Sequence, residues 1–189
     1  SIAPHIPHND SNAVLQTKTL RVAAQNLSLM AGSGSKQTLH TATNKFVVVE
    51  EMTMFFDTPS GNVSTPKFSS GPGIHSGNLV CSLFSEWSGG NHRDGALSLK
   101  ANEVNQPFGA TNYKKFFKAT FRDTLATDSD TQRQVIPGNI TSWTTKVQVH
   151  ITQNLTAQAA GSWYIYIQVK FREYDVQTEL RNITPDVTL

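Results

Sequence analysis

The sequence lacks several features that would place it in common protein classes. Its single cysteine, Cys81, excludes an internal disulfide framework and a cysteine-based metal centre. It has no run of about 18 apolar residues, the length that a membrane-spanning helix needs. Only 16% of its residues are charged, too few for a disordered chain. We therefore expect a folded protein without a membrane span or a membrane partner, whose 189 residues enclose one hydrophobic core.

A large excess of positive charge is also missing. The chain carries 16 lysines and arginines against 14 aspartates and glutamates, which gives a net charge of +2. A protein whose main task is to bind nucleic acid is usually much more basic. Any contact with nucleic acid is therefore expected at a local cluster of cations, or through a segment outside this chain.

The residue patterns of catalytic and cofactor-binding sites are absent too. Of the six histidines, only His5 and His8 lie close together in the sequence, and no carboxylate or cysteine stands beside them at a metal-ligand spacing. The G-x-S-x-G motif of serine hydrolases does not occur. We therefore expect no catalytic residue, no metal ligand and no cofactor, and a protein that is not an enzyme.

Two short patterns imitate catalytic groups. His92-Arg93-Asp94 matches the triplet of the protein-kinase catalytic loop, but the asparagine that should follow is missing. Because glycines flank this triplet, we interpret it as a charged surface turn. Glu50 and Glu51 are neighbours in a predicted strand, where successive side chains point to opposite faces, so they are not expected to act as an acid/base couple.

Alternation of apolar and polar residues is the strongest pattern in the sequence. From Trp163 to Arg172, five apolar side chains share one face and five more polar ones share the other, which predicts a strand of an antiparallel sheet. Ile167 and Val169 are expected in the core. Similar but weaker patterns predict eight strands in all, at 17–24, 44–56, 78–86, 96–100, 112–122, 131–136, 143–151 and 163–172.

The predicted loops at 25–43 and 57–77 are too long for tight hairpins, so consecutive strands are expected to cross between two sheets. The fold class predicted is therefore all-β, an eight-stranded double-sheet jelly roll. Residues 1–16 are interpreted as an extended N-terminal arm that lies across a neighbouring subunit, 17–175 as the jelly-roll shell domain and 176–189 as a C-terminal tail.

The predicted strand at 112–122 carries the candidate binding site. One of its faces presents Lys114, Phe116, Lys118 and Arg122. Phosphate oxygens attract such a row of cations without sequence preference, and the phenylalanine offers a stacking surface to an unpaired base. These four residues are the predicted nucleic-acid-binding residues. The alternative is an ordinary solvated face, or lysines that protect the edge of a sheet.

One segment resembles a known family. Residues 164–174 form an aromatic and β-branched run that ends in Phe171, Arg172, Glu173 and Tyr174. This run resembles the last strand of circovirus capsid proteins, the coat proteins of small circular single-stranded-DNA viruses. The resemblance implies a jelly-roll coat protein that forms a small icosahedral shell around a DNA genome. The family also begins with an arginine-rich arm, which residues 1–16 do not provide, and its tail differs from 175–189.

The leading interpretation is a viral coat protein whose partners are copies of itself and packaged viral nucleic acid. Its expected location is the virion, and the host nucleus during assembly is left open. The alternative is a carbohydrate- or receptor-binding jelly roll, either lectin-like or a trimeric spike head, whose partner is a host glycan or receptor. Trp87, which stands beside a glycine-rich stretch, is suited to stacking on a sugar ring. A cupin-type enzyme is a third interpretation, but it needs clustered histidine and glutamate ligands that the sequence does not show.

Overall fold

The computed structural model describes residues 13–32, 35–57, 78–99, 115–120, 132–152, 164–175 and 186–189. Within these ranges, strands account for most of the chain. The elements are β1 (Gln16–Ala23), the 3-10 helix η1 (Ala24–Met30), β2 (Gln37–Thr43), β3 (Lys45–Asp57), β4 (Leu79–Trp87), β5 (Gly90–Leu99), β6 (Lys115–Thr120), β7 (Trp143–Ile151) and β8 (Tyr164–Asp175).

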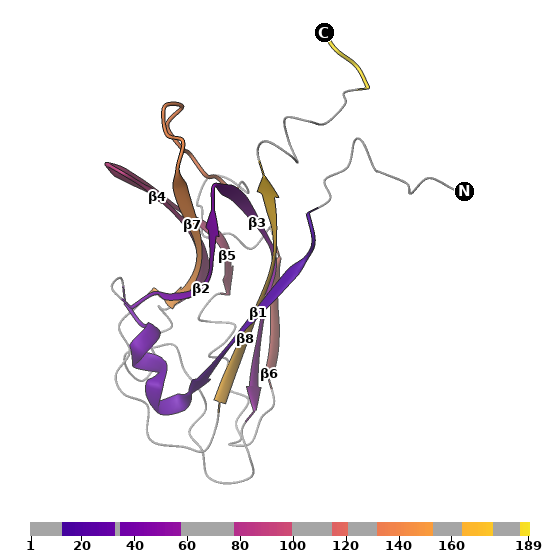
Figure 1. Ribbon diagram of the computed structural model, residues 1–189. Coiled ribbons are helices and arrows are strands. Elements are labelled where there is room, and N and C mark those ends of the chain that lie inside the picture. Colours follow the sequence, from indigo (N-terminus) through magenta and orange to yellow (C-terminus); the bar gives the residue numbers. More distant parts are fainter. Residues whose placement is uncertain are drawn as a thin grey trace, which may run out of the picture.

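The strands form two antiparallel four-stranded sheets that pack face to face (Figure 1). The first has the order β1-β8-β3-β6, and the second has the order β2-β7-β4-β5. Consecutive strands change sheet at every step except β4 to β5, which form a hairpin. This strand order is that of a jelly roll, so the predicted fold class is confirmed.

The core lies between the two sheets and follows the alternation of the sequence. In β8, the side chains of Ile165, Ile167, Val169 and Phe171 are fully buried, as the sequence pattern predicts. From the opposite sheet, β4 and β7 contribute buried aliphatic side chains that face them. Each fully buried side chain of this size contributes roughly 1.5–3 kcal/mol to folding.

The observed strands differ from the predicted ones in three places. Residues 37–43 form β2, although the sequence analysis assigns them to a loop. Residues 132–136 do not pair with a neighbour as a backbone strand, so the prediction of a strand at 131–136 is wrong for its described residues. The triplet His92-Arg93-Asp94 lies inside β5 rather than in a turn, because the tight turn of the β4–β5 hairpin comes earlier, at Ser88 and Gly89.

Residues 132–136 run beside β3 but pair with it through side chains. The Gln134 carboxamide accepts the N–H of Val47 at 2.9 Å and donates to its carbonyl at 2.6 Å. Gln132 does the same at Val49, at 2.8 and 2.5 Å. Because β6 pairs only with Glu51–Phe56, these four hydrogen bonds satisfy backbone groups on the part of the β3 edge that β6 leaves uncovered.

A β-bulge in β3 corrects the expectation for Glu50 and Glu51. The pairing of β3 with β8 shifts by one residue between Val49 and Glu51, so Glu50 is the extra residue. Val49 and Met52 both remain buried, and the two glutamates therefore lie on the same, outward side. Glu50 contacts the Arg172 side chain at 2.7 Å, while Glu51 contacts two lysines.

Candidate nucleic-acid interface

The outward face of the β1-β8-β3-β6 sheet carries exposed aromatic and basic side chains. Its strands are in register, so outward residues form rows that cross all four strands. One row runs from Arg21 on β1 to Tyr166 on β8, Phe55 on β3 and Phe116 on β6, each paired with the next. The next row consists of Thr19, Gln168, Thr53 and Lys118.

The first row, together with Tyr164, forms an aromatic surface that we call the aromatic row. The ring centroids of Phe55 and Tyr166 lie 6.3 Å apart, and those of Tyr164 and Tyr166 lie 6.4 Å apart. Phe116 is 66% exposed and Tyr164 is 40% exposed. The Arg21 guanidinium lies over the Tyr164 ring, 4.8 Å from its centroid, as in a cation–π contact. Exposed rings beside a cation suit stacking of unpaired bases.

A small ion-pair cluster adjoins the aromatic row. The Glu51 carboxylate lies 2.9 Å from the ammonium of Lys118 and 3.5 Å from that of Lys170. The hydrogen bond from Lys118 is the main cause that lowers the pKa of Glu51, and Lys170 adds to it. The carboxylate is therefore ionised at neutral pH, and the cluster of two lysines and one glutamate keeps one net positive charge.

The predicted binding residues fall into two groups. Phe116 and Lys118 point outward from β6, while Ala119 points into the core, as the alternation predicts. Lys114 and Arg122 lie outside the described residues. The charge of Lys118 is partly balanced by Glu51. Nucleic-acid binding by this face remains a prediction.

The alternation of the sequence does not identify Arg21, Phe55, Tyr164 and Tyr166 as parts of this face. They come from three strands other than β6, and only the register of the sheet brings them together. One signal was available for the two tyrosines, since both lie on the predicted outward face of β8. Nothing in the sequence connects that strand with Phe116.

The outward face of the other sheet is occupied by contacts within the protein. Arg93 lies over the Phe84 ring at 4.3 Å and donates hydrogen bonds to Ser82 at 3.2 Å and to Gln148 at 2.7 Å. Burial, with smaller contributions from Lys36 and Arg93, lowers the pKa of His150 to about 4, so this histidine is uncharged at neutral pH. Arg93 is thus held by hydrogen bonds to two side chains, and Lys146 on the same sheet is ion-paired with Glu86.

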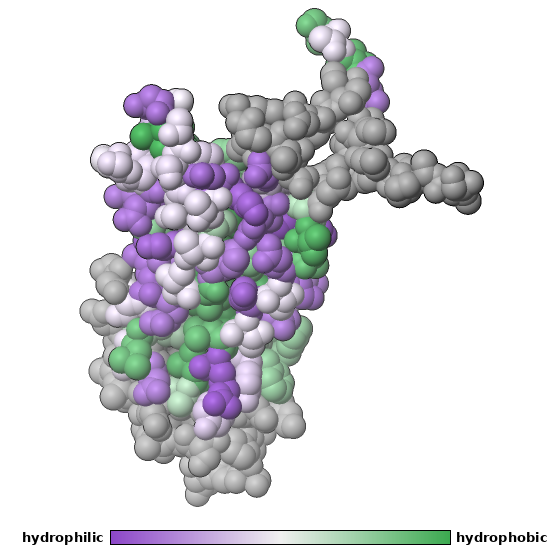
Figure 2. Space-filling view, in the orientation of Figure 1, coloured by the Kyte–Doolittle hydropathy of each residue, from purple (hydrophilic) through white to green (hydrophobic). Residues whose placement is uncertain are grey.

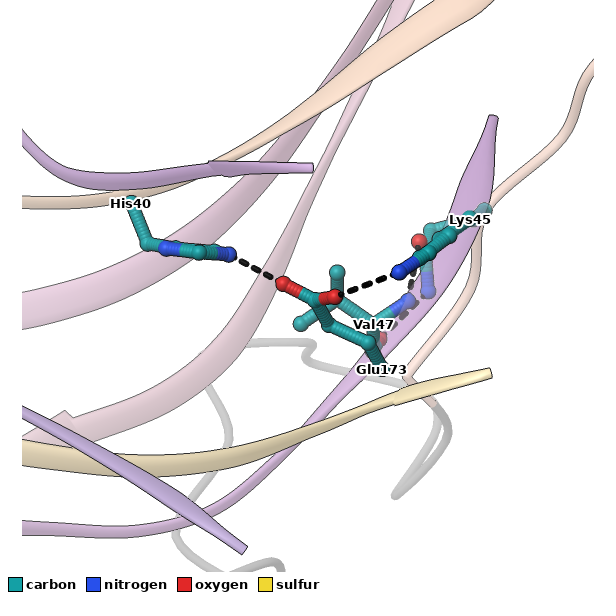
Figure 3. A network of polar contacts seen from close by, with 5 residues as sticks. His40, Lys45, Val47 and Glu173 are labelled. Atoms are coloured by element: carbon teal, nitrogen blue, oxygen red, sulfur yellow. Dashed lines mark hydrogen bonds and ion pairs between the residues drawn. The ribbon is translucent and has the colours of Figure 1, made fainter. Parts of the chain in front are cut away.

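One histidine–glutamate pair deserves comparison with catalytic dyads. His40 on β2 is hydrogen-bonded to Glu173 on β8, and Lys45 contacts the second carboxylate oxygen at 3.2 Å (Figure 3). Burial alone would raise the pKa of Glu173, but the hydrogen bonds from His40 and Lys45 outweigh it and lower the pKa. The His40 ring also packs against Phe171, with centroids 4.7 Å apart. These contacts connect the two sheets, and we interpret the group as structural.

Among the residues that the structure describes, no group of three or more histidine, cysteine, aspartate or glutamate side chains could hold a metal ion. No helix in the same part of the chain is long and apolar enough to cross a membrane.

No protein-family model matches the sequence, and no curated protein matches it either. Solved structures of viral capsids are among those to which it is similar. They include the cyanophage Pam1 capsid asymmetric unit, with 14% identity, 91% of each chain covered and a TM-score of 0.35. They also include infectious bursal disease virus, Gt strain, with 12% identity, 94% of this chain and 39% of that chain covered, and a TM-score of 0.33. The fold assignment rests on the strand order of the two sheets.

Proposed function

We propose that the chain is a viral coat protein that assembles with copies of itself into a small icosahedral shell around a nucleic-acid genome. Jelly rolls of eight strands are the usual fold of such coat proteins, although lectins and cupins share it. The fold alone therefore does not distinguish a coat protein from a lectin or a cupin, and the side chains on the surface must do so. The resemblance of 164–174 to circovirus capsid proteins supports the same function.

The observation that carries the proposal is the aromatic row. Its rings extend across three strands, and on the fourth the row ends at Arg21, a cation that has no carboxylate partner among the described residues. Rings that stack with bases and cations that attract phosphates together bind single-stranded nucleic acid without sequence preference. The face thus suits the inner surface of a shell that packages any sequence of its genome.

The carbohydrate-binding alternative loses its main support. The Trp87 ring is half-buried and packs against the backbone of Gly90, where an added Cβ would lie 2.9 Å from the indole nitrogen. This tryptophan is thus part of the hairpin. The cupin alternative would need a cluster of metal ligands between the sheets, and among the described residues no three histidine, cysteine, aspartate or glutamate side chains lie together in such a cluster.

Light scattering and negative-stain electron microscopy of the purified chain test the assembly. We expect closed particles on the order of a megadalton, because closed symmetry is the usual outcome of repeated self-contact. Particles that contain nucleic acid will absorb more at 260 nm than the protein alone. Monomers or trimers at every salt concentration and pH would contradict the proposal and favour the receptor-binding alternative.

Charge removal tests the binding face. Arg21→Gln combined with Lys118→Gln should leave folding intact, because exposed charges contribute little to stability. It should reduce the salt dependence of binding to single-stranded nucleic acid by about 0.7 units of slope for each lost phosphate contact. Lys146→Gln is the matched control, because Lys146 is ion-paired with Glu86 on the other sheet. If Lys146→Gln reduced the salt dependence as much as the double variant, the outward face of the β1-β8-β3-β6 sheet would have no special role in binding.

A further inference from the structure

A pocket lies at the end of β1, where the chain enters η1. Its cavity volume is about 190 Å³. Val22 and Met30 are buried at its floor, whereas Leu29 at its rim is 63% exposed. The Gln37 side chain donates a hydrogen bond to the Leu29 carbonyl at 3.0 Å and fixes this rim. An apolar cavity of about 150 Å³ accommodates a benzene molecule, so this pocket has room for one large branched side chain.

An exposed apolar segment lies at the opposite end of β1. Ala13 is buried, and its carbonyl accepts a hydrogen bond from Arg172 at 2.7 Å. Arg172 is itself held by Glu50 at 2.7 Å. The next two residues, Val14 and Leu15, are 74% and 41% exposed. Their backbone is thus anchored while their side chains face solvent, which reduces the entropy lost when they bind a partner.

The same copy cannot bring these two features together. Leu15 and Val22 are separated by seven residues of an extended strand, about 24 Å at roughly 3.4 Å per residue. Figure 2, viewed as in Figure 1, shows hydrophobic surface both near η1 and beside the start of β1. The segment can therefore reach only the pocket of another copy.

We propose that the Leu15 side chain of one copy inserts into the pocket between β1 and η1 of a second copy. The inference rests on the proposed self-assembly and names one of its contacts. Such a head-to-tail contact uses two different surfaces, so it repeats around a ring and can close a shell. The donors of Arg21, Asn26 and Gln37 at the pocket lining can bind backbone carbonyls of the inserted segment.

The sequence before the segment favours the same occupant. Twelve residues precede Ala13, so any contact that they make with a neighbour begins beside Val14 and Leu15.

Disulfide cross-linking between two cysteine variants tests the contact directly. Copies with Leu15→Cys are mixed with copies that carry Leu29→Cys, and the mixture is oxidised. We expect a covalent heterodimer in the mixture and at least tenfold less dimer in either variant alone. Cys81 gives no background because it is fully buried. Val135→Cys replaces Leu29→Cys as the control, since Val135 is 51% exposed but outside the pocket.

Assembly of aspartate variants provides the second test. Leu15→Asp and Leu29→Asp change exposed residues, so their circular dichroism should match that of the wild type, while both should lose the large particles seen by light scattering. Val187→Asp is the control, because Val187 is exposed too, at 74%, and does not line the pocket. If the wild type assembles and both variants assemble equally well, or if Leu15→Cys cross-links as well to Val135→Cys, this contact is wrong and the coat function stands. A wild type that stays monomeric contradicts both.

Discussion

His40 on β2 and Glu173 on β8 form a hydrogen bond from one sheet to the other, and Lys45 completes the group. The two residues are 133 positions apart in the sequence. Both side chains are largely buried, at 19% and 14% exposed. The bond therefore ties the two sheets together at one end of the core.

We predict that Glu173→Gln lowers the free energy of unfolding at pH 7 by about 1–3 kcal/mol, the usual contribution of hydrogen bonds to a charged group. The pKa of Glu173 is lowered from 4.5 in the folded protein, so its contribution is present above the unfolded pKa and is lost as the pH falls through the folded one. Urea unfolding between pH 7 and pH 3 measures this. The difference in unfolding free energy between wild type and variant should disappear below about pH 4.5. A difference that does not change with pH would mean that the charge of the carboxylate contributes nothing to stability.

Ile167→Asp should abolish soluble protein. Ile167 is fully buried, and an uncompensated buried carboxylate costs several kcal/mol of the roughly 5–15 kcal/mol that stabilise a domain. Gln168→Asp is the control at the next residue, whose side chain points outward and bonds Thr19. The soluble fraction after expression and the melting temperature are the measurements. A folded Ile167→Asp variant would contradict the placement of the core.

Loss of the aromatic row should weaken binding to single-stranded nucleic acid. We expect Phe116→Leu and Tyr166→Leu each to reduce affinity by about 1–3 kcal/mol if the ring stacks on a base. The salt dependence should stay the same, because no charge is removed. Fluorescence anisotropy with a labelled oligonucleotide measures both quantities. Phe84→Leu on the other sheet is the control, and an equal loss there would show that the effect is not specific to this face.

Removal of the two glutamines should loosen one half of β3. Gln132→Ala with Gln134→Ala removes four hydrogen bonds to Val47 and Val49, each contributing about 0.5–1.5 kcal/mol. Hydrogen exchange at these two amides should become faster, while amides of β3 opposite β6 keep their protection. Gln168→Ala, which removes one bond between side chains, should change neither. Uniform exchange along β3 would contradict a side-chain role at this edge.

Cys81 should be inert towards alkylating reagents in the folded protein. It is fully buried, and burial raises the pKa of its thiol to about 12, so almost no thiolate exists at neutral pH. Iodoacetamide should modify it only after denaturant is added, with the loss of free thiol followed by mass spectrometry. Rapid modification without denaturant would show that β4 opens locally.

The sequence was sufficient to predict most strands and the composition of the core, because burial on one face leaves a regular pattern. Trp143–Ile151 and Tyr164–Asp175 follow that pattern closely. β2 was missed because His40 and several threonines dilute its alternation, so only pairing with β7 identifies it as a strand. The segment at 131–136 was misassigned because glutamine side chains there replace backbone pairing.

The candidate site could be predicted only in part. Alternation within β6 is local, so it correctly places Phe116 and Lys118 on one face. Pairing between strands is not local, and it alone adds Tyr166 and Arg21 to the same surface. The ion pair of Lys118 with Glu51 likewise depends on the pairing of β6 with β3, which alternation within one strand does not reveal.

The β-bulge at Glu50 shows that the number of residues in β3, and not only their types, decides which side chains face outward. Glu50 is one surplus residue, and the strand absorbs it without changing which side its later residues face. A chain lacking Glu50 would form a regular strand in which Phe55 still faces outward. Deletion of one residue between Glu51 and Phe55 would instead turn the side chains on one side of the deletion to the opposite face of the sheet. The aromatic surface from Tyr166 to Phe116 is therefore continuous only while the number of residues between Glu51 and Phe55 keeps Phe55 on the outward side. The extra residue Glu50 lies outside that stretch, so it does not disturb the alternation there.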